Sequence, residues 1–134
     1  MNSTRSLCIV DDTADYRFLL QHLFKTFFPT YPVRFFPDGQ TFLKAITQMQ
    51  PLPGLIVLDQ HMPELDGHQT LVQLKQHPVH QTIPVILMSS TDSVPEIVDC
   101  YQAGANAFVL KPVDFESLKQ TMGLICDYWM ELNQ

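Results

Sequence analysis

The sequence has few basic residues. Lysine and arginine together number 8 in 134 residues, against 14 aspartates and glutamates, which gives a formal net charge of −6. Proteins that bind nucleic acid directly use basic side chains to neutralise phosphates. This charge balance therefore argues against a DNA- or RNA-binding function.

Long hydrophobic runs and paired cysteines are also missing. The apolar runs are far shorter than the roughly 20 residues that span a membrane, and the start, Met1–Arg5, lacks the apolar core of a secretory signal. Cys8, Cys100 and Cys126 are odd in number and have no short paired spacing, which predicts reduced residues in or near the core. We therefore expect a cytoplasmic protein that does not insert into a membrane.

The sequence does contain short apolar segments that alternate with helical patterns. Such alternation is typical of an α/β fold, and right-handed crossovers between the strands place helices on both faces of the sheet. The pattern predicts a single domain with a doubly wound, five-stranded parallel sheet and five helices. The predicted strands are Leu7–Val10, Val33–Phe36, Leu55–Leu58, Val85–Met88 and Ala107–Leu110, and the predicted helices cover residues 13–28, 39–49, 67–76, 94–102 and 115–132.

Several polar residues indicate where these helices begin and end. Asp38 and Asp66 precede helical stretches as N-cap candidates, and Ser93 with Glu96 has the form of a capping box. Gly104 follows a helical stretch, where a left-handed residue commonly ends a helix.

Three of the predicted strands run directly into charged residues. The first is followed by Asp11 and Asp12, the third by Asp59, and the fifth by Lys111. In open α/β sheets, ligands bind just beyond the carboxyl ends of the strands. Unit charges a few ångströms apart repel by roughly 4 kcal/mol at an effective dielectric constant of 20, and one lysine cannot neutralise three carboxylates. The sequence therefore predicts a divalent cation, with Mg²⁺ the usual choice where phosphate oxygens share the site.

These residues occur in the order and spacing of a known family. From about Ser6 to Leu132, the chain resembles the receiver domains of response regulators, the CheY-like family with a flavodoxin-like fold. The resemblance implies a role in two-component signal transduction, in which a histidine kinase or a phosphotransfer protein donates a phosphoryl group. The matching motifs are Asp11-Asp12, Asp59–Gly67, Pro84–Ser90, Gly104-Ala105 followed by Phe108, and Lys111-Pro112.

The resemblance also implies a metal site. Asp59 is the expected phosphoacceptor. Asp12, Asp59 and the main-chain carbonyl of His61 are expected to hold Mg²⁺ directly, and Asp11 through a water molecule. On this reading the protein is not an enzyme with a separate substrate, because it catalyses only its own phosphorylation and dephosphorylation.

The resemblance further implies a switch. Lys111 and the Ser89 hydroxyl are expected to contact the phosphoryl oxygens, and Ser89 and Phe108 are expected to move when phosphate binds. Phe108 lacks the hydroxyl of the tyrosine often found at this position, which suggests a looser switch. The Lys111-Pro112 peptide bond is expected to be cis, as in the family.

Two alternatives are compatible with parts of the pattern. One is a Mg²⁺-dependent phosphotransferase or phosphatase that forms an aspartyl-phosphate. The haloacid-dehalogenase type of that chemistry has a second acid two residues after the nucleophile, whereas His61 stands there. The other is a pseudo-receiver that acts as an adaptor without phosphate, but such proteins ordinarily lack one of Asp12, Asp59 and Lys111.

The final helix carries a second pattern. Leu124 and Tyr128 lie outside its predicted core stripe, on the family's usual output surface. We expect a homodimer or a partner complex through the fourth helix, fifth strand and fifth helix. The chain also resembles the stand-alone regulators of bacterial phytochromes, which implies one receiver over residues 1–134 and no effector domain. The predicted core stripe comprises Phe115, Leu118, Met122, Ile125, Trp129 and Leu132.

Overall fold

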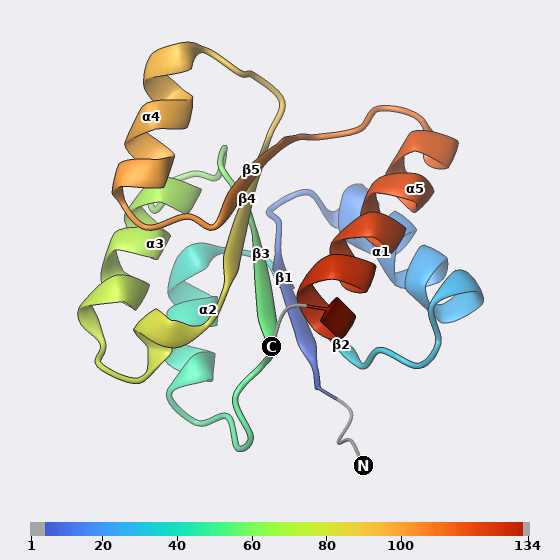
Figure 1. Ribbon diagram of the computed structural model, residues 1–134, viewed down its shortest axis with the longest axis horizontal. Coiled ribbons are helices and arrows are strands. Elements are labelled where there is room, and N and C mark those ends of the chain that lie inside the picture. Colours follow the sequence, from blue (N-terminus) through green and yellow to red (C-terminus); the bar gives the residue numbers. More distant parts are fainter. Residues whose placement is uncertain (1–4, 133–134) are drawn as a thin grey trace.

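The computed structural model describes residues 5–132, which form a parallel sheet with helices on both faces (Figure 1). The strand order is β2-β1-β3-β4-β5, as expected for a doubly wound domain. The elements are β1 (Leu7–Val10), α1 (Ala14–Phe27), β2 (Val33–Phe36), α2 (Gly39–Ile46), β3 (Leu55–Asp59), α3 (Gly67–Gln76), β4 (Val85–Ser89), α4 (Val94–Gln102), β5 (Ala107–Leu110) and α5 (Phe115–Ile125).

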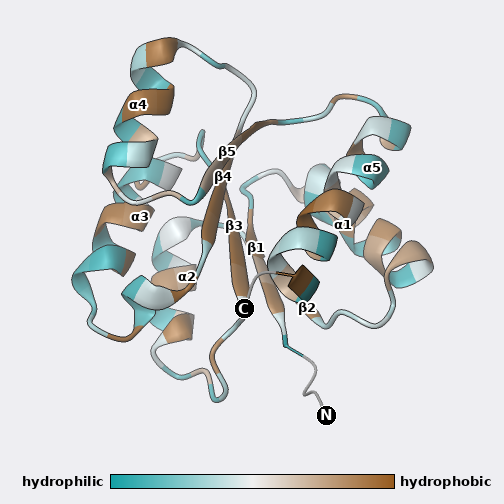
Figure 2. Ribbon diagram, viewed as in Figure 1, coloured by the Kyte–Doolittle hydropathy of each residue, from teal (hydrophilic) through white to brown (hydrophobic). Residues whose placement is uncertain are grey.

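The three central strands, β1, β3 and β4, are buried along their whole length and apolar up to the last residue of β3 and β4, because helices cover both faces of the sheet (Figure 2). Alternate side chains enter different cores. Leu58 and Leu87 lie in the core with α2, α3 and α4, whereas Val57 and Ile86 lie in the core with α1 and α5. Because all five strands run parallel, their carboxyl ends lie at one edge of the sheet.

The sequence predicted the strands closely. Three strands have the predicted bounds, whereas β3 and β4 each extend one residue further, to Asp59 and Ser89. The helix predicted over 39–49 ends earlier, at Ile46. The three cysteines are buried and free, as expected. Within residues 5–132, no helix combines the length and apolar character needed to cross a membrane.

The predicted helix signals are also present. Asp38 and Asp66 accept the main-chain N–H three residues on, at 2.7 and 2.8 Å. Ser93 accepts the N–H of Glu96 at 3.3 Å. The Glu96 side chain turns away from this cap toward the end of β4, so the reciprocal half of the predicted capping box is not formed. Gly104 ends α4 with a φ of 110°.

The C-terminal segment departs from the single helix predicted over 115–132. It is α-helical to Ile125 and then π-helical over Cys126–Leu132. A π-helix bonds i to i+5, so its side chains rotate out of the phase predicted for an α-helix. Leu132 is consequently 73% exposed and Met130 is buried instead, so the prediction of Leu132 in the core was wrong.

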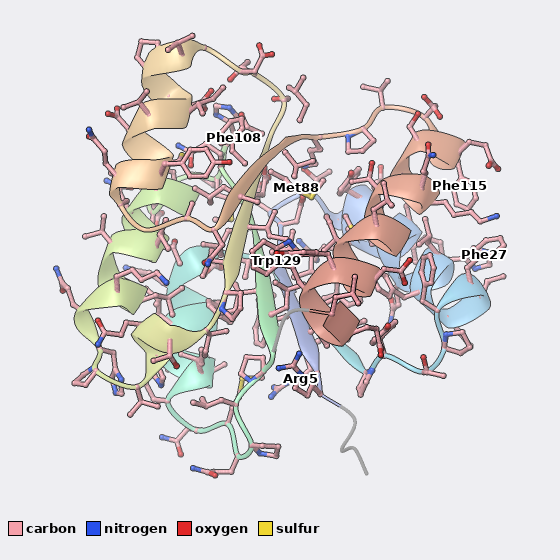
Figure 3. The ribbon with its side chains drawn as sticks, viewed as in Figure 1. Arg5, Phe27, Met88, Phe108, Phe115 and Trp129 are labelled. Atoms are coloured by element: carbon pink, nitrogen blue, oxygen red, sulfur yellow. The ribbon has the colours of Figure 1, made fainter. Side chains whose placement is uncertain are left out.

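Arg5 contacts this π-helical segment from the other end of the chain (Figure 3). Its guanidinium donates to the main-chain oxygens of Trp129 and Met130, at 3.3 and 3.2 Å. These bonds satisfy carbonyl groups near the end of the helix, where carbonyls lack intrahelical partners.

Candidate functional site

The predicted acidic residues come together at the carboxyl end of the sheet. Asp11 and Asp12 follow β1, and Asp59 is the last residue of the neighbouring strand β3. One carboxylate oxygen from each lies within 4.8 Å of the others. Asp11 and Asp59 are buried, whereas Asp12 is exposed. The cluster therefore has one carboxylate open to solvent and two beneath it.

Lys111 reaches this cluster from the end of β5. Its Nζ lies 2.7 Å from Oδ2 of Asp11 and 3.4 Å from Oδ2 of Asp59. The main-chain N–H of Lys111 donates to the Ser89 carbonyl at 2.7 Å, which continues the ladder between β4 and β5. The ammonium also lies over the ring of Tyr16 on α1, 4.2 Å from the ring centroid. Lys111 is thus held by two carboxylates and an aromatic face.

The electrostatics of the cluster favour a cation. Burial, followed by the neighbouring charge of Asp11, raises the pKa of Asp59 to about 6, although Lys111 and the His61 N–H oppose this shift. Excess negative charge therefore persists around Asp59 despite the nearby ammonium. The candidate ligands are carboxylate oxygens, which suit a hard divalent cation such as Mg²⁺. The residues present thus fit the predicted metal.

Asp11 and Asp12 differ in the hydrogen bonds that their carboxylate oxygens accept. Asp11 accepts the Thr13 N–H through Oδ1 at 2.8 Å and Lys111 through Oδ2, so both its oxygens are engaged. The Asp12 side chain has no hydrogen bond to any residue in the described part of the chain. Among these two acids, Asp12 is therefore the one whose oxygens are not engaged by other described residues.

A second polar network adjoins the acidic cluster at the end of β4. Ser89 is fully buried, and its hydroxyl donates to Glu96 at 3.3 Å. The Thr91 hydroxyl donates to the same carboxylate at 2.9 Å. Nε2 of His61 lies 3.0 Å from the Ser89 hydroxyl and 3.1 Å from that of Thr91. The sequence pattern indicated Glu96 only as a helix-start residue, so this role was not predicted.

Phe108 lies on the side of the sheet covered by α3 and α4 (Figure 3). Its ring is partly buried against that core. Its main-chain N–H donates to the hydroxyl of Tyr101 on α4 at 3.1 Å. This bond joins β5 to α4 through the main chain of Phe108, and the sequence pattern did not predict it.

The expected cis peptide bond at Lys111-Pro112 is absent. This bond is trans, and Gln50-Pro51 is the only cis bond within residues 5–132. With this bond trans, the Lys111 ammonium donates to Asp11 and the Lys111 main-chain N–H donates to the Ser89 carbonyl. The site therefore forms without the rarer isomer, and this prediction was wrong.

Comparisons with known proteins agree with this geometry. The family model for the response regulator receiver domain matches residues 7–122. The chain is 27% identical over 132 residues to the probable methanogenesis regulatory protein FilR2 of Methanothrix harundinacea, covering 96% of this chain and 85% of that protein. It is also 27% identical over 130 residues to the response regulator Rcp1 of Synechocystis, covering 93% of this chain and 88% of that protein.

Solved structures show the same fold. The phosphorylated cyanobacterial phytochrome response regulator RcpA matches with a TM-score of 0.87 and 23% identity, covering 96% of both chains. The Mn²⁺-bound form of Rcp1 matches with a TM-score of 0.83 and 24% identity, also covering 96% of both chains. The family match over most of the chain and the site at the strand ends establish that this chain belongs to the response regulator receiver domain family of two-component signalling.

Proposed function

We propose that Asp59 is the phosphoacceptor and that Asp12, Asp59 and the main-chain carbonyl of His61 hold Mg²⁺, with Asp11 acting through water. The observation that carries the proposal is the convergence of three carboxylates and Lys111 at the ends of β1, β3 and β5. The Mn²⁺-bound form of Rcp1 shows that a relative with this fold binds a divalent cation.

The proposed donor is a phosphohistidine of a histidine kinase or a phosphotransfer protein. A carboxylate oxygen of Asp59 attacks phosphorus as the P–N bond breaks, and the electron pair of that bond returns to the histidine ring. Asp12, Asp59 and the His61 carbonyl would hold Mg²⁺, which would supply charge neutralisation for the transfer. Lys111 and the Ser89 hydroxyl stabilise the remaining phosphoryl oxygens. Water later hydrolyses the aspartyl-phosphate, so the protein catalyses only its own phosphorylation and dephosphorylation.

This function is tested with acetyl phosphate, a small donor that needs no kinase. Wild-type protein with Mg²⁺ should gain one phosphoryl group, and Asp59→Asn should gain none. Asp12→Ala should bind Mg²⁺ more weakly in calorimetry. Phosphorylation that continues in Asp59→Asn, or that proceeds equally well in the presence of a chelator, would contradict the proposal.

The proposed output is a homodimer through α4, β5 and α5. Large apolar side chains are exposed on these elements and on the π-helical segment that follows α5, including Leu110 at 49%, Leu124 at 64% and Tyr128 at 51%. Contiguous exposed apolar surface is typical of protein–protein contacts. The Tyr101 contact with Phe108 joins this surface to the proposed switch residue.

Analytical ultracentrifugation with and without beryllofluoride tests the dimer. The wild type should sediment as a larger species when beryllofluoride and Mg²⁺ are present, and Tyr128→Ala should reduce this change. Phe18→Ala is the matched control, because Phe18 is an exposed aromatic residue on α1, which is not one of the three elements of this surface. Unchanged sedimentation of the wild type, or equal effects of the two variants, would refute this interface.

The proposed location is the cytoplasm. Three buried free cysteines are consistent with a reducing compartment.

A further inference from the structure

We propose that Glu96 is a positioning residue that holds the Ser89 hydroxyl away from Asp59 and so opposes activation. The inference rests on the proposed function, because it assumes that Ser89 donates to the phosphoryl group. It adds a residue outside the motifs that identify the family. Glu96 lies in the first turn of α4, seven residues after Ser89.

The Glu96 carboxylate gathers three polar groups from separate positions. Its side chain is 16% exposed, and Nε2 of His61 lies 3.4 Å from Oε2. Oε2 also accepts the Ser89 hydroxyl at 3.3 Å, and Oε1 accepts the Thr91 hydroxyl at 2.9 Å. Within the described residues, Ser89 makes no hydrogen bond to Asp59. In this arrangement the Ser89 hydroxyl is therefore in hydrogen-bond contact with Glu96 and not with Asp59.

The Ser89 hydroxyl can donate to only one acceptor at a time. The Ser89 hydroxyl has one proton to donate, and its oxygen accepts the Thr91 N–H at 3.1 Å. The Ser89 and Thr91 hydroxyl oxygens also lie 3.3 Å apart. When both hydroxyls donate to the Glu96 carboxylate, which can only accept, Nε2 of His61 supplies the proton in its contacts with them. Ser89 can then donate to a phosphoryl oxygen on Asp59 only by giving up Glu96.

The negative charge of Glu96 acts in the same direction as this competition. Hydrogen bonds to an ionised acceptor are stronger than those to a neutral one, so the carboxylate retains the Ser89 proton well. This competition resists the phosphorylated state, and it is removed when Glu96 is replaced.

Beryllofluoride binding in the presence of Mg²⁺ measures this resistance. Glu96→Ala should bind the phosphoryl mimic about three- to tenfold more tightly than the wild type, the factor that one net hydrogen bond supplies. Glu96→Gln keeps the shape and a weaker acceptor, so its gain should be smaller. Asp99→Asn is the matched control, since it removes one negative charge from α4 without touching this network.

Two further measurements separate positioning from other roles. In a Ser89→Ala background, Glu96→Ala should no longer tighten binding, because the competed proton is gone. In metal-free protein, Glu96→Ala should shift the NMR signal of the Thr91 amide, which donates to the Ser89 oxygen. This second readout does not depend on phosphate chemistry.

The proposed function and the role of Glu96 fail on different results. Failure of the wild type to bind beryllofluoride with Mg²⁺ would overturn the proposed function. An unmoved Thr91 amide in Glu96→Ala would overturn the positioning role of Glu96. An affinity gain that persists without the Ser89 hydroxyl, or that Asp99→Asn reproduces, would also overturn it.

Discussion

Asp59→Asn is predicted to stabilise the metal-free protein above neutral pH. Asp59 is 5% exposed, and burial together with Asp11 raises its pKa from 3.8 to about 6. The ionised carboxylate is therefore less favourable in the folded protein than in the unfolded chain. A shift of about 2 units at roughly 1.4 kcal/mol per unit corresponds to about 3 kcal/mol, which asparagine avoids because it carries no charge. The amide of asparagine replaces the hydrogen bonds only in part, so we expect a gain of about 1–3 kcal/mol.

The pH dependence of this gain follows from the direction of the pKa shift. The folded state binds the Asp59 proton more tightly than the unfolded chain does, so this group favours folding below about pH 4. That contribution is lost as the pH rises through about 6. The difference in stability between Asp59→Asn and the wild type should therefore grow between these two pH values and then remain constant.

Urea unfolding with a chelator present, at several pH values, provides the assay. With a typical slope of 1–3 kcal/mol per molar urea, the midpoint of Asp59→Asn should lie about 1 M higher at pH 8. Asp12→Asn is the matched control, because it removes the same charge from an exposed side chain and should shift the midpoint less. Equal or lower stability of Asp59→Asn at pH 8, or a gain independent of pH, would refute the electrostatic reasoning.

Four other substitutions, at three positions, test the surroundings of the site. Lys111→Ala should still accept phosphate from acetyl phosphate, but at least about tenfold more slowly, and beryllofluoride should then perturb the NMR signals of α4 less. Tyr16→Phe keeps the ring under Lys111 and removes a buried hydroxyl that has no partner within the described residues, so its phosphorylation rate should be normal. Tyr16→Leu removes the ring, and its phosphorylation should be several-fold slower. In Gly67→Ala, the added Cβ would lie 2.7 Å from the Asp59 carbonyl oxygen and 2.9 Å from Cα of Gln60. Backbone must therefore shift, and we expect a loss of about 1–3 kcal/mol in urea unfolding with weaker Mg²⁺ binding in calorimetry.

The fold and the acidic cluster were predictable because they depend on local sequence patterns. Each strand is a short apolar run, and the parallel alternation fixes which ends share an edge of the sheet. Asp11, Asp12, Asp59 and Lys111 had to converge once those strands were assigned. The helix caps at Asp38 and Asp66 were predictable for the same reason, because a cap joins residues only three positions apart.

The remaining features depend on contacts that the sequence does not encode locally. Glu96 fitted a capping box, but its carboxylate bonds to Ser89 and Thr91 because the end of β4 lies beside α4 in the folded chain. Leu132 fitted an α-helical stripe, but the π-helical segment changed the phase of the last turns. Arg5 contributes to that segment from the opposite end of the chain.

The most direct test of the account is to locate the phosphoryl group. After reaction with acetyl phosphate and Mg²⁺, borohydride reduces an aspartyl-phosphate to homoserine, which peptide mass spectrometry identifies. We predict homoserine at position 59 in the wild type, and none when Mg²⁺ is omitted. Modification at another aspartate, a phosphohistidine at His61, or homoserine that forms without any divalent cation would contradict the assignment of Asp59 as the Mg²⁺-dependent phosphoacceptor.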